Sequence, residues 1–314
     1  MKSKKQASGA AAPFHSSLFT PHSLPAPLRW LSPHARALPG GATRTLIMGI
    51  LNLTPDSFSD GGQLPTPQAA AARARALLAD GADILDIGGE STRPGHAPVS
   101  ESAELARVLP ALEAIRREFP AAPISIDTSK PAVARAAIRA GADIVNDTQG
   151  GQTAAMPAAI AELRCPIILM HNRADAVPVY ADFWPDVLAD LKNSIALMRA
   201  AGVADTQIWA DPGFGFAKTH AQNLEVLKHL SRIAALGYPV LLGTSRKSTI
   251  GEALREPAPE KRLAGTAATL VWGIQQGARM VRVHDVAAMR PFVQMADAIR
   301  AGATWKEPPT TPSP

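Results

Sequence analysis

The stretch Pro239-Val240-Leu241-Leu242-Gly243-Thr244, followed at once by Ser245-Arg246-Lys247-Ser248, contains the pattern from which the fold can be predicted. A short apolar run of this kind is typical of a strand buried in a parallel sheet. Its polar end then falls at the carboxyl end of the strand, where α/β enzymes bind their ligands. Two cations between two hydroxyls suit an anionic ligand, although such residues also occur on ordinary solvated turns.

The pattern of an apolar run with a polar end recurs between Thr45 and Gly302, and an Ala- and Leu-rich helical stretch follows each run. Glycine before several runs, at Gly81, Gly141 and Gly277, fits the cap of a preceding helix. Eight strands alternating with eight helices over about 255 residues have the size of a (β/α)₈ TIM barrel, an α/β fold; a doubly wound open sheet is the competing arrangement. Strands are expected near residues 45–51, 83–88, 123–127, 143–146, 166–170, 207–211, 239–244 and 280–284, and helices near 67–79, 101–118, 131–139, 154–163, 182–200, 220–235, 259–276 and 286–300.

The barrel is expected over residues 44–302, between a basic, Pro-, Ser- and Ala-rich extension at 1–43 and a Pro-rich tail at 303–314. Both ends lack a helical or strand period and are predicted to be disordered, the alternative for the first being a transit peptide. The formal charge of +5 comes from the extension, because the chain beyond residue 44 has 26 basic and 27 acidic residues. A nearly neutral body offers no basic face for nucleic acid.

Cys165 is the lone cysteine of the 314 residues, which excludes an internal disulfide and a thiolate metal cluster. It precedes an apolar run, so a buried structural thiol is favoured over a nucleophile. No stretch approaches the ~18 consecutive apolar residues of a membrane span. We therefore expect a cytoplasmic protein with no membrane partner.

The residues at the predicted strand ends carry the functional signal. Aspartate and asparagine often cap helices, but capping explains poorly why every end is polar or glycine-rich. Carboxylates and amides suit a flat heterocycle with hydrogen-bond donors, whereas Lys, Arg and His suit an anion. A ligand with a hydrogen-bonding ring and a negatively charged group is therefore predicted. The ends are Asn52, Gly88-Gly89-Glu90, Asp127, Asn146-Asp147, Met170-His171, Asp211, Ser245-Arg246-Lys247 and Arg282-Val283-His284.

The loops at 52–62 and 89–95 are longer than the usual connection between a strand and a helix in a barrel. Both contain glycines that can act as hinges, and long loops over a barrel mouth are often lids that exclude water. The alternative is a pair of passive surface loops.

Seven motifs, in order from about residue 47 to 286, resemble the signatures of the dihydropteroate synthase family of pterin-binding enzymes. They cover essentially the whole predicted barrel. The motifs are Leu51-Asn52-Leu53-Thr54-Pro55-Asp56-Ser57-Phe58-Ser59-Asp60-Gly61-Gly62, Asp86-Ile87-Gly88-Gly89-Glu90-Ser91-Thr92-Arg93-Pro94-Gly95, Ser125-Ile126-Asp127-Thr128, Val145-Asn146-Asp147, Asp211-Pro212-Gly213-Phe214-Gly215-Phe216-Ala217-Lys218, Ser245-Arg246-Lys247-Ser248 and Arg282-Val283-His284-Asp285.

The resemblance implies a transferase of folate biosynthesis that joins 4-aminobenzoate to 7,8-dihydropterin-6-ylmethyl diphosphate and releases diphosphate. It implies an SN1-like substitution assisted by Mg²⁺, with no nucleophilic side chain. It further implies competition by sulfonamides, which imitate 4-aminobenzoate, and pairing into a homodimer through helices remote from the active face.

The resemblance also assigns the site residues. The pterin pocket would contain Asp127, Asn146, Asp211 and Lys247, and the diphosphate clamp Arg282 and His284. Thr92 and Arg93 would lie close to both substrates, while Asn52 would hold Mg²⁺. The 4-aminobenzoate slot would be formed by Pro94, Phe216 and Ser248 together with Lys247.

Two stretches depart from the family pattern. Met170-His171-Asn172-Arg173 stands where Met-His-Met-Gln is usual, and Thr148-Gln149-Gly150-Gly151 replaces a more apolar start. Neither change removes a charged site residue. Two alternatives stay open at this point: a pterin-dependent methyltransferase domain, which has no use for a diphosphate clamp, and a catalytically silent paralogue retained as a binding protein.

Overall fold

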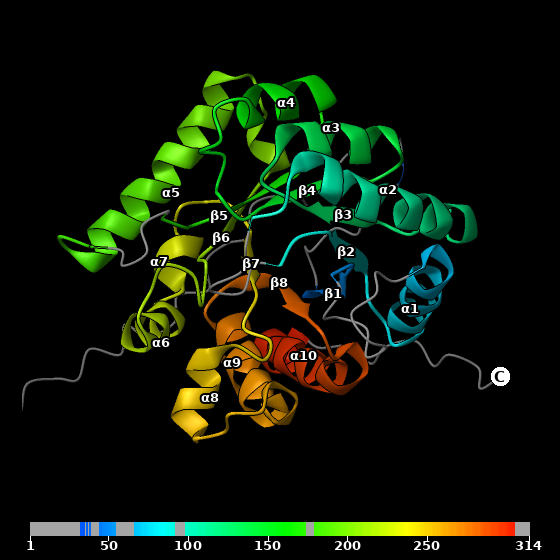
Figure 1. The fold of residues 1–314 in the computed structure, drawn as a ribbon. Helices are drawn as coiled ribbons and strands as arrows, with labels where there is room; N and C mark the ends of the chain where they lie inside the picture. The colour runs from blue at the N-terminus through cyan, green and yellow to red at the C-terminus, as the bar shows by residue number, and fades with distance from the viewer. Residues whose placement is uncertain are drawn as a thin grey trace, which may run out of the picture.

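The computed structural model describes residues 32–34, 36, 38, 44–54, 66–91, 98–173 and 179–304, which form a closed parallel barrel (Figure 1). Neighbouring strands follow chain order, and β8 pairs with β1 to close the sheet. The TIM barrel is confirmed, since a doubly wound sheet would leave two open edges. The strands are β1 Leu46–Asn52, β2 Ile84–Gly88, β3 Ile124–Asp127, β4 Ile144–Asp147, β5 Ile167–Met170, β6 Ile208–Asp211, β7 Val240–Leu242 and β8 Ala278–Val283.

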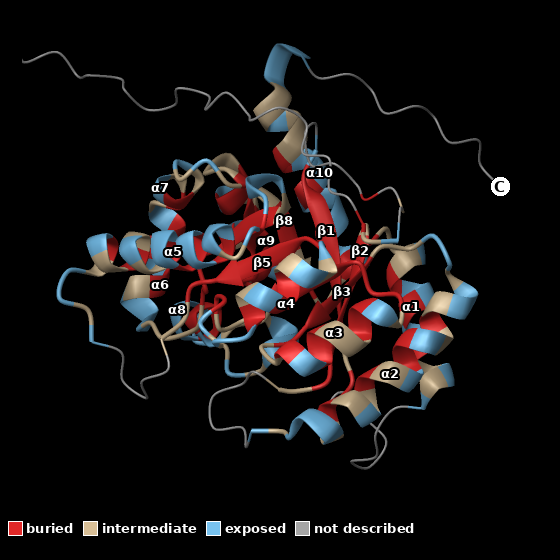
Figure 2. Cartoon of the chain, turned by 90° about the horizontal axis from the view of Figure 1, so that it is seen from above, coloured by how far each residue is buried: buried red, intermediate tan, exposed pale blue. Residues whose placement is uncertain are grey.

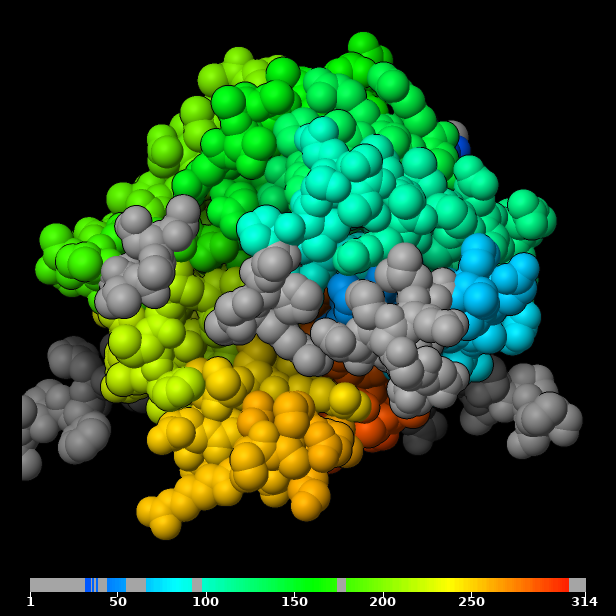
Figure 3. Space-filling view, viewed as in Figure 1, coloured from blue at the N-terminus to red at the C-terminus, as the bar shows by residue number. Residues whose placement is uncertain are grey.

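The helices form an outer layer around the strands (Figure 1). The colours from the N-terminus to the C-terminus run once around the molecule (Figure 3). Seen from above, the strands are buried while the helices expose their outer faces (Figure 2). The helices are α1 Pro67–Ala79, α2 Glu101–Glu118, α3 Pro131–Arg139, α4 Met156–Leu163, α5 Phe183–Ala200, α6 His220–Lys228, α7 Ser231–Ala234, α8 Ser248–Leu254, α9 Leu263–Gln275 and α10 Val286–Ala301.

Two predicted helices differ from the structure. The helix expected over 220–235 is divided into α6 and α7, and the one expected over 259–276 is the 3₁₀ turn Pro259–Lys261 followed by α9. The short helix α8 was not predicted at all. Its seven residues span two turns and end before Pro257 and Pro259, which is too short for a helical period to be recognised.

Local sequence signals explain where several helices begin and end. Thr66 caps α1 by accepting from Ala69 N at 3.1 Å, and Ser100 caps α2 by accepting from Ala103 N at 3.2 Å. The predicted cap glycines are confirmed. Gly81, Gly141 and Gly277 have φ values of 101°, 114° and 111°, a region that residues with a side chain rarely adopt.

Most strands contribute at least one buried apolar side chain to the barrel interior. The largest of these is Trp209 on β6, which is fully buried. Side chains of this size contribute about 1.5–3 kcal/mol each when they leave water. The interior is therefore a packed core and not a channel. Its members are Leu38, Leu46, Met48, Ile84, Ile144, Ile168, Trp209, Leu241 and Met280.

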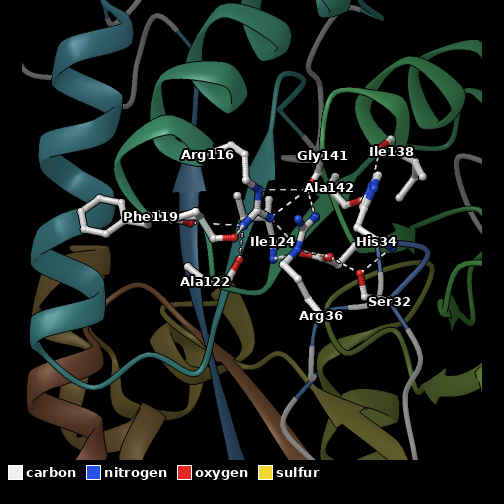
Figure 4. Close-up of polar contacts among 12 residues, drawn as sticks. Ser32, His34, Arg36, Arg116, Phe119, Ala122, Ile124, Ile138, Gly141 and Ala142 are labelled. Carbon is white, nitrogen blue, oxygen red and sulfur yellow. Dashed lines mark hydrogen bonds and ion pairs between the residues drawn. The ribbon is translucent and has the colours of Figure 1, made fainter.

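Of the few described residues in the predicted N-terminal extension, four contact the amino face of this barrel. Ser32 Oγ donates to the buried carboxylate of Asp143 at 2.5 Å, and Arg36 Nε donates to the same oxygen at 2.8 Å (Figure 4). His34 Nε2 lies 2.8 Å from Ile138 O, while Leu38 joins the interior core. At these positions the stretch expected to be a separate flexible extension is part of the folded body.

Cys165 is buried and its thiol is free, as predicted. Burial raises the pKa of its thiol to about 12, so the reactive thiolate is not formed near neutral pH. Within the described part of the chain, none of the helices has the length and apolar character that crossing a bilayer requires.

Candidate active site at the carboxyl face of the barrel

The carboxyl ends of the first four strands bring three predicted site residues into one row. Register pairs Asn52 with Gly88, Gly88 with Asp127, and Asp127 with Asn146. Gly88 has no side chain between its neighbours, and a Cβ there would lie 3.6 Å from Asn52 Oδ1 and 3.5 Å from Asp127 Cβ. The glycine therefore leaves space in which a ligand can approach the amide and the carboxylate.

Arg282 lies on β8, which pairs with β1 at one end of this row, and its side chain reaches along the row to β2 and β3. Its Nε donates to Asp86 Oδ2 at 2.6 Å and its Nη2 to Asp127 Oδ2 at 2.7 Å. Burial alone would lower the pKa of Arg282, but the two carboxylates outweigh burial and raise it. The predicted anion-binding cation is thus paired with two anions in this structure.

Asp86 is a site residue that the sequence assignments missed. It is fully buried on β2, its Oδ2 accepts from Arg282 and from Asn146 Nδ2 at 3.4 Å, and its Oδ1 has no hydrogen-bond partner among the described residues. A carboxylate within the apolar run Ile84-Leu85-Asp86-Ile87 was the available signal. Because unpaired buried polar atoms are costly, such a residue usually has a functional reason.

The carboxyl group of Asp127 has a pKa close to neutral pH. Burial raises the pKa of its carboxyl to about 7, although the charge of Arg282 acts in the opposite direction. Asp211, at the end of β6, also has a raised pKa because of burial, with Lys247 opposing the effect. Both carboxyls therefore bind a proton more readily than they would in water.

Lys247 belongs to the motif Ser245-Arg246-Lys247-Ser248, which follows β7. Burial lowers the pKa of its ammonium to about 8, against the attraction of Asp211. Nζ donates to Phe214 O and lies 4.4 Å from the centre of the Phe216 ring. The structure thus brings Lys247 and Phe216 together, as predicted.

The remaining cations of the two basic motifs have different surroundings. His284 Nδ1 lies 3.0 Å from Ser245 Oγ, which also accepts from the His284 backbone N at 3.2 Å. Arg246 instead forms a two-pronged ion pair with Asp285 and ties the β7 and β8 ends together. Ser248 is exposed at the first position of α8, directly beside Lys247.

Thr92, Arg93 and Pro94 lie outside the described residues, as does most of the loop after Asn52. The described metal donors are sparse: no cluster of three His, Cys, Asp or Glu side chains suited to a metal occurs in the part of the chain that the structure describes. A single amide oxygen from Asn52 nevertheless fits Mg²⁺, which keeps several waters and is commonly held by one or two protein oxygens together with substrate phosphates.

This arrangement offers hydrogen-bond acceptors and donors that suit one flat ligand. Asp127, Asn146 and Asp211 offer carboxylate and amide groups, while Lys247 and Arg282 supply donors within the same mouth. The lone thiol, Cys165, is buried at the amino side of β5 and cannot serve as a nucleophile at this face. The site is suited to binding a heterocycle and stabilising charge, not to forming a covalent bond with it.

Comparison with known proteins agrees with this reading of the site. The profile of the pterin binding enzyme family matches residues 48–284. Dihydropteroate synthase of Bacillus subtilis is 49% identical over 257 residues, which are 82% of this chain and 89% of that protein. The chain belongs to the dihydropteroate synthase family.

Structures of dihydropteroate synthases have the same barrel. The enzyme of Xanthomonas albilineans with 4-aminobenzoic acid superposes with a TM-score of 0.82 at 44% identity, covering 87% of this chain and 99% of that one. The same enzyme in complex with 7,8-dihydropteroate gives a TM-score of 0.76 at 43% identity, covering 82% and 95%. The family match spans every strand end that contributes a described site residue here.

Proposed function

We propose that this chain catalyses the dihydropteroate synthase reaction, in which 7,8-dihydropterin-6-ylmethyl diphosphate and 4-aminobenzoate give 7,8-dihydropteroate and diphosphate. The observation that carries the proposal is the group of buried, mutually opposed charges at one barrel mouth: Asp127 and Asp211 with raised pKa values, and Lys247 with a lowered one. Such groups favour a ligand that provides the missing hydrogen bonds in a dry site.

The pterin would bind deepest. An ionised Asp211 can accept from the 2-amino group and a ring N–H together, while Asn146 and Lys247 can bond the remaining edge and the ring carbonyl. Asp127 would lie near the ring and stabilise the positive charge that develops when the bond to diphosphate breaks. Each of these four side chains belongs to a strand end or the residues just after it, so the pocket is held by the rigid sheet.

The diphosphate would be bound by Arg282 and His284, with Thr92 and Arg93 assigned to the region between the two substrates. Arg282 already has two carboxylate partners, and a diphosphate would compete for its guanidinium. Asn52 would hold Mg²⁺ against the diphosphate, where the ion supplies electrostatic stabilisation of the leaving group.

4-Aminobenzoate would enter a slot formed by Pro94, Phe216, Lys247 and Ser248. Its amine is neutral near pH 7 and needs no dedicated base. The C–O bond to diphosphate breaks with its electron pair on diphosphate, the amine nitrogen forms the new C–N bond, and its proton passes to solvent. Sulfonamides, which share the shape and charge of 4-aminobenzoate, would compete for this slot.

We also propose that two copies pair through α9 and α10. These neighbouring helices expose Trp272, Phe292, Met295 and Ile299, with 47% of Trp272 and 59% of Met295 accessible. A groove between the helices is lined by small residues of α9 together with Trp272 and Phe292. An apolar surface of this kind suits a self-complementary interface, and it leaves the barrel mouth open to substrates in the cytoplasm.

Purified protein incubated with both substrates and Mg²⁺ tests the reaction directly. We expect stoichiometric dihydropteroate and diphosphate, loss of most turnover on chelation of Mg²⁺, and inhibition by a sulfonamide that added 4-aminobenzoate relieves. Absence of both products would contradict the proposal and favour the silent-paralogue alternative. Methyl transfer from methyltetrahydrofolate to a corrinoid, without formation of dihydropteroate, would favour the methyltransferase alternative instead.

A further inference from the structure

The turn that follows β6 determines where Lys247 lies. Phe214 O accepts from Lys247 Nζ, the Phe216 ring lies 4.4 Å from the same atom, and Gly215 passes the Lys247 stem so closely that a Cβ would lie 2.8 Å from Cδ. A shift of this turn would therefore displace the cation and the aromatic ring together.

The turn is strained at one residue, Ala217, whereas its two glycines adopt positive φ values without a steric penalty. Gly213, Gly215 and Ala217 have φ values of 64°, 82° and 49°. The left-handed conformation costs a residue with a Cβ, such as Ala217, roughly 1–2 kcal/mol. Strained backbone of this kind persists only where surrounding contacts fix it.

Lys218 supplies the central contacts of that kind. Its chain folds back beneath the turn, and Nζ donates to Gly213 O and Phe216 O, each at 3.1 Å. The third donor points to His171 Nδ1 at 2.8 Å, beyond the end of β5. One ammonium thus joins both sides of the turn to the neighbouring strand end.

The partners of Lys218 fix the state of His171. An ammonium can only donate, so Nδ1 accepts, and Nε2 carries the hydrogen that is directed to Asp190 Oδ2 at 3.1 Å. Burial, followed by the charge of Lys218, lowers the pKa of His171 to about 4, which agrees with a neutral ring. Asp190 on α5 therefore orients His171, and His171 orients Lys218.

Arg173, one of the departures from the family pattern, reinforces the same chain of contacts. Its Nε donates to Asp190 Oδ2 at 2.7 Å, and its guanidinium lies 4.3 Å from the centre of the Tyr180 ring. Tyr180 in turn donates its hydroxyl to Ala217 O at 2.7 Å. The strained residue of the turn is thus held from outside by a second route.

The electrostatic cost of this arrangement argues that it has a function. The three hydrogen bonds of the Lys218 ammonium within the described structure all go to neutral acceptors. Burial lowers the pKa of Lys218 to about 7, even though Asp211 favours the charged form. A group held at such a cost for stability alone could be replaced by an apolar side chain.

We propose that Lys218, oriented by His171 and Asp190, is a positioning residue for 4-aminobenzoate binding: it fixes the 213–217 turn so that Phe216 and Lys247 form the slot. The inference rests on the function proposed above. Binding of the pterin depends less on this turn, because Asp127 and Asn146 lie on β3 and β4, away from it. The turn contacts the pterin pocket through Lys247 and through Gly213 N, which donates to Asp211 Oδ1 at 2.7 Å.

Steady-state kinetics of Lys218→Met test the proposal, with Lys228→Met as the matched control because Lys228 is exposed on α6. We expect the KM for 4-aminobenzoate to rise about 10-fold or more in Lys218→Met. The KM for the pterin diphosphate should rise by a smaller factor, about 3-fold, because Asp211 and Lys247 also contact the turn. We expect kcat to fall less than the KM for 4-aminobenzoate rises, and Lys228→Met to match the wild type.

Tyr180→Phe is the second variant, because it removes one hydroxyl and leaves the packing of the ring. We expect the same selective rise in the KM for 4-aminobenzoate, about 3-fold. Should Lys218→Met fail to fold, Tyr180→Phe decides. Unchanged KM values for 4-aminobenzoate in folded variants, or an equal rise in both KM values, would overturn the positioning role. A wild-type enzyme without product would instead refute the proposed function itself.

Discussion

The two ends of the barrel treat buried carboxylates in opposite ways. At the amino face, Asp143 is fully buried and accepts from Ser32, Arg36, Arg116 and the backbone N of Ile124, all within 3.0 Å (Figure 4). At the carboxyl face, Asp86 Oδ1 has no hydrogen-bond partner among the residues that the structure describes. The carboxylate at the amino face is fully hydrogen-bonded within the fold, whereas the one at the carboxyl face can still accept a hydrogen bond from a ligand.

The comparison separates stability from function. A carboxylate with every lone pair directed at a donor stabilises the fold, and removing it leaves the donors unpaired. Carboxylates whose pKa values are raised by burial, such as Asp127 and Asp211, make the empty protein less stable than it could be. Substitutions at the two ends should therefore have opposite effects on stability and activity.

The largest effect is expected at the carboxyl face. Asp211→Ala should weaken binding of a dihydropterin by ~100-fold or more, because a paired, charge-assisted contact is lost in a dry site. Arg282→Ala should chiefly weaken the binding of ligands that carry the diphosphate. Calorimetric titration with the pterin alcohol and with its diphosphate separates the two roles. Equal loss of affinity for the pterin alcohol in both variants would show that this division is wrong.

The next effect is expected at the amino face. Asp143→Ala should lower the free energy of unfolding by about 3–5 kcal/mol, because the partly buried Arg36 and Arg116 lose their buried carboxylate. Turnover per folded molecule should stay near that of the wild type. Denaturant unfolding measures the first and active-site titration the second. Asp182→Ala, an exposed aspartate before α5, is the control, and a loss of equal size there would remove the contrast.

Deletion of residues 1–40 should have a smaller effect on the same face. The loss of Leu38 from the core and of the Ser32 and Arg36 hydrogen bonds should cost about 2–4 kcal/mol of stability. Turnover should be unchanged. A variant that lacks only residues 1–30 keeps these contacts and should melt as the full chain does. If both truncated proteins had the melting temperature of the full chain, the contacts of these four residues would contribute nothing to stability.

The smallest effect concerns stability at the carboxyl face. Asp127→Asn should abolish turnover yet stabilise the protein by about 1–3 kcal/mol near pH 8. The folded pKa of about 7 lies above the unfolded value, so the wild type loses stability as pH rises toward and through 7. The difference in melting temperature between variant and wild type should therefore grow from pH 5 to pH 8. A constant difference would contradict the raised pKa.

Most of the fold and much of the site could be predicted from the sequence. Apolar runs with polar ends placed all eight strands within a few residues, and the strand ends named Asp127, Asn146, Asp211, Lys247 and Arg282, which the structure brings to one mouth. Periodicity could not divide 220–235 at His229 or find α8, since short helices have no repeat to recognise.

What the sequence could not reveal are contacts between residues far apart in the chain. Asp86 appeared as part of a motif, but its ion pair with Arg282 spans the closing seam of the barrel. Arg36 looked like one more charge of a basic extension until its pairing with Asp143 was seen. Arg173 appeared as a departure from the family, and only the structure connects it through Tyr180 to the turn that carries Phe216.

The central claim is that the buried carboxyl groups of the barrel mouth bind the pterin in their ionised form and lose a bound proton when it binds. Its most direct test is calorimetric titration of a dihydropterin at pH 6.5 in buffers that differ in ionisation enthalpy. We predict net release of protons by the wild type, because burial raises the pKa of Asp127 to about 7 and this carboxyl ionises when the pterin binds, and a smaller release by Asp127→Asn. Tight binding with no proton exchange, or binding that Asp211→Asn leaves unchanged, would contradict the account.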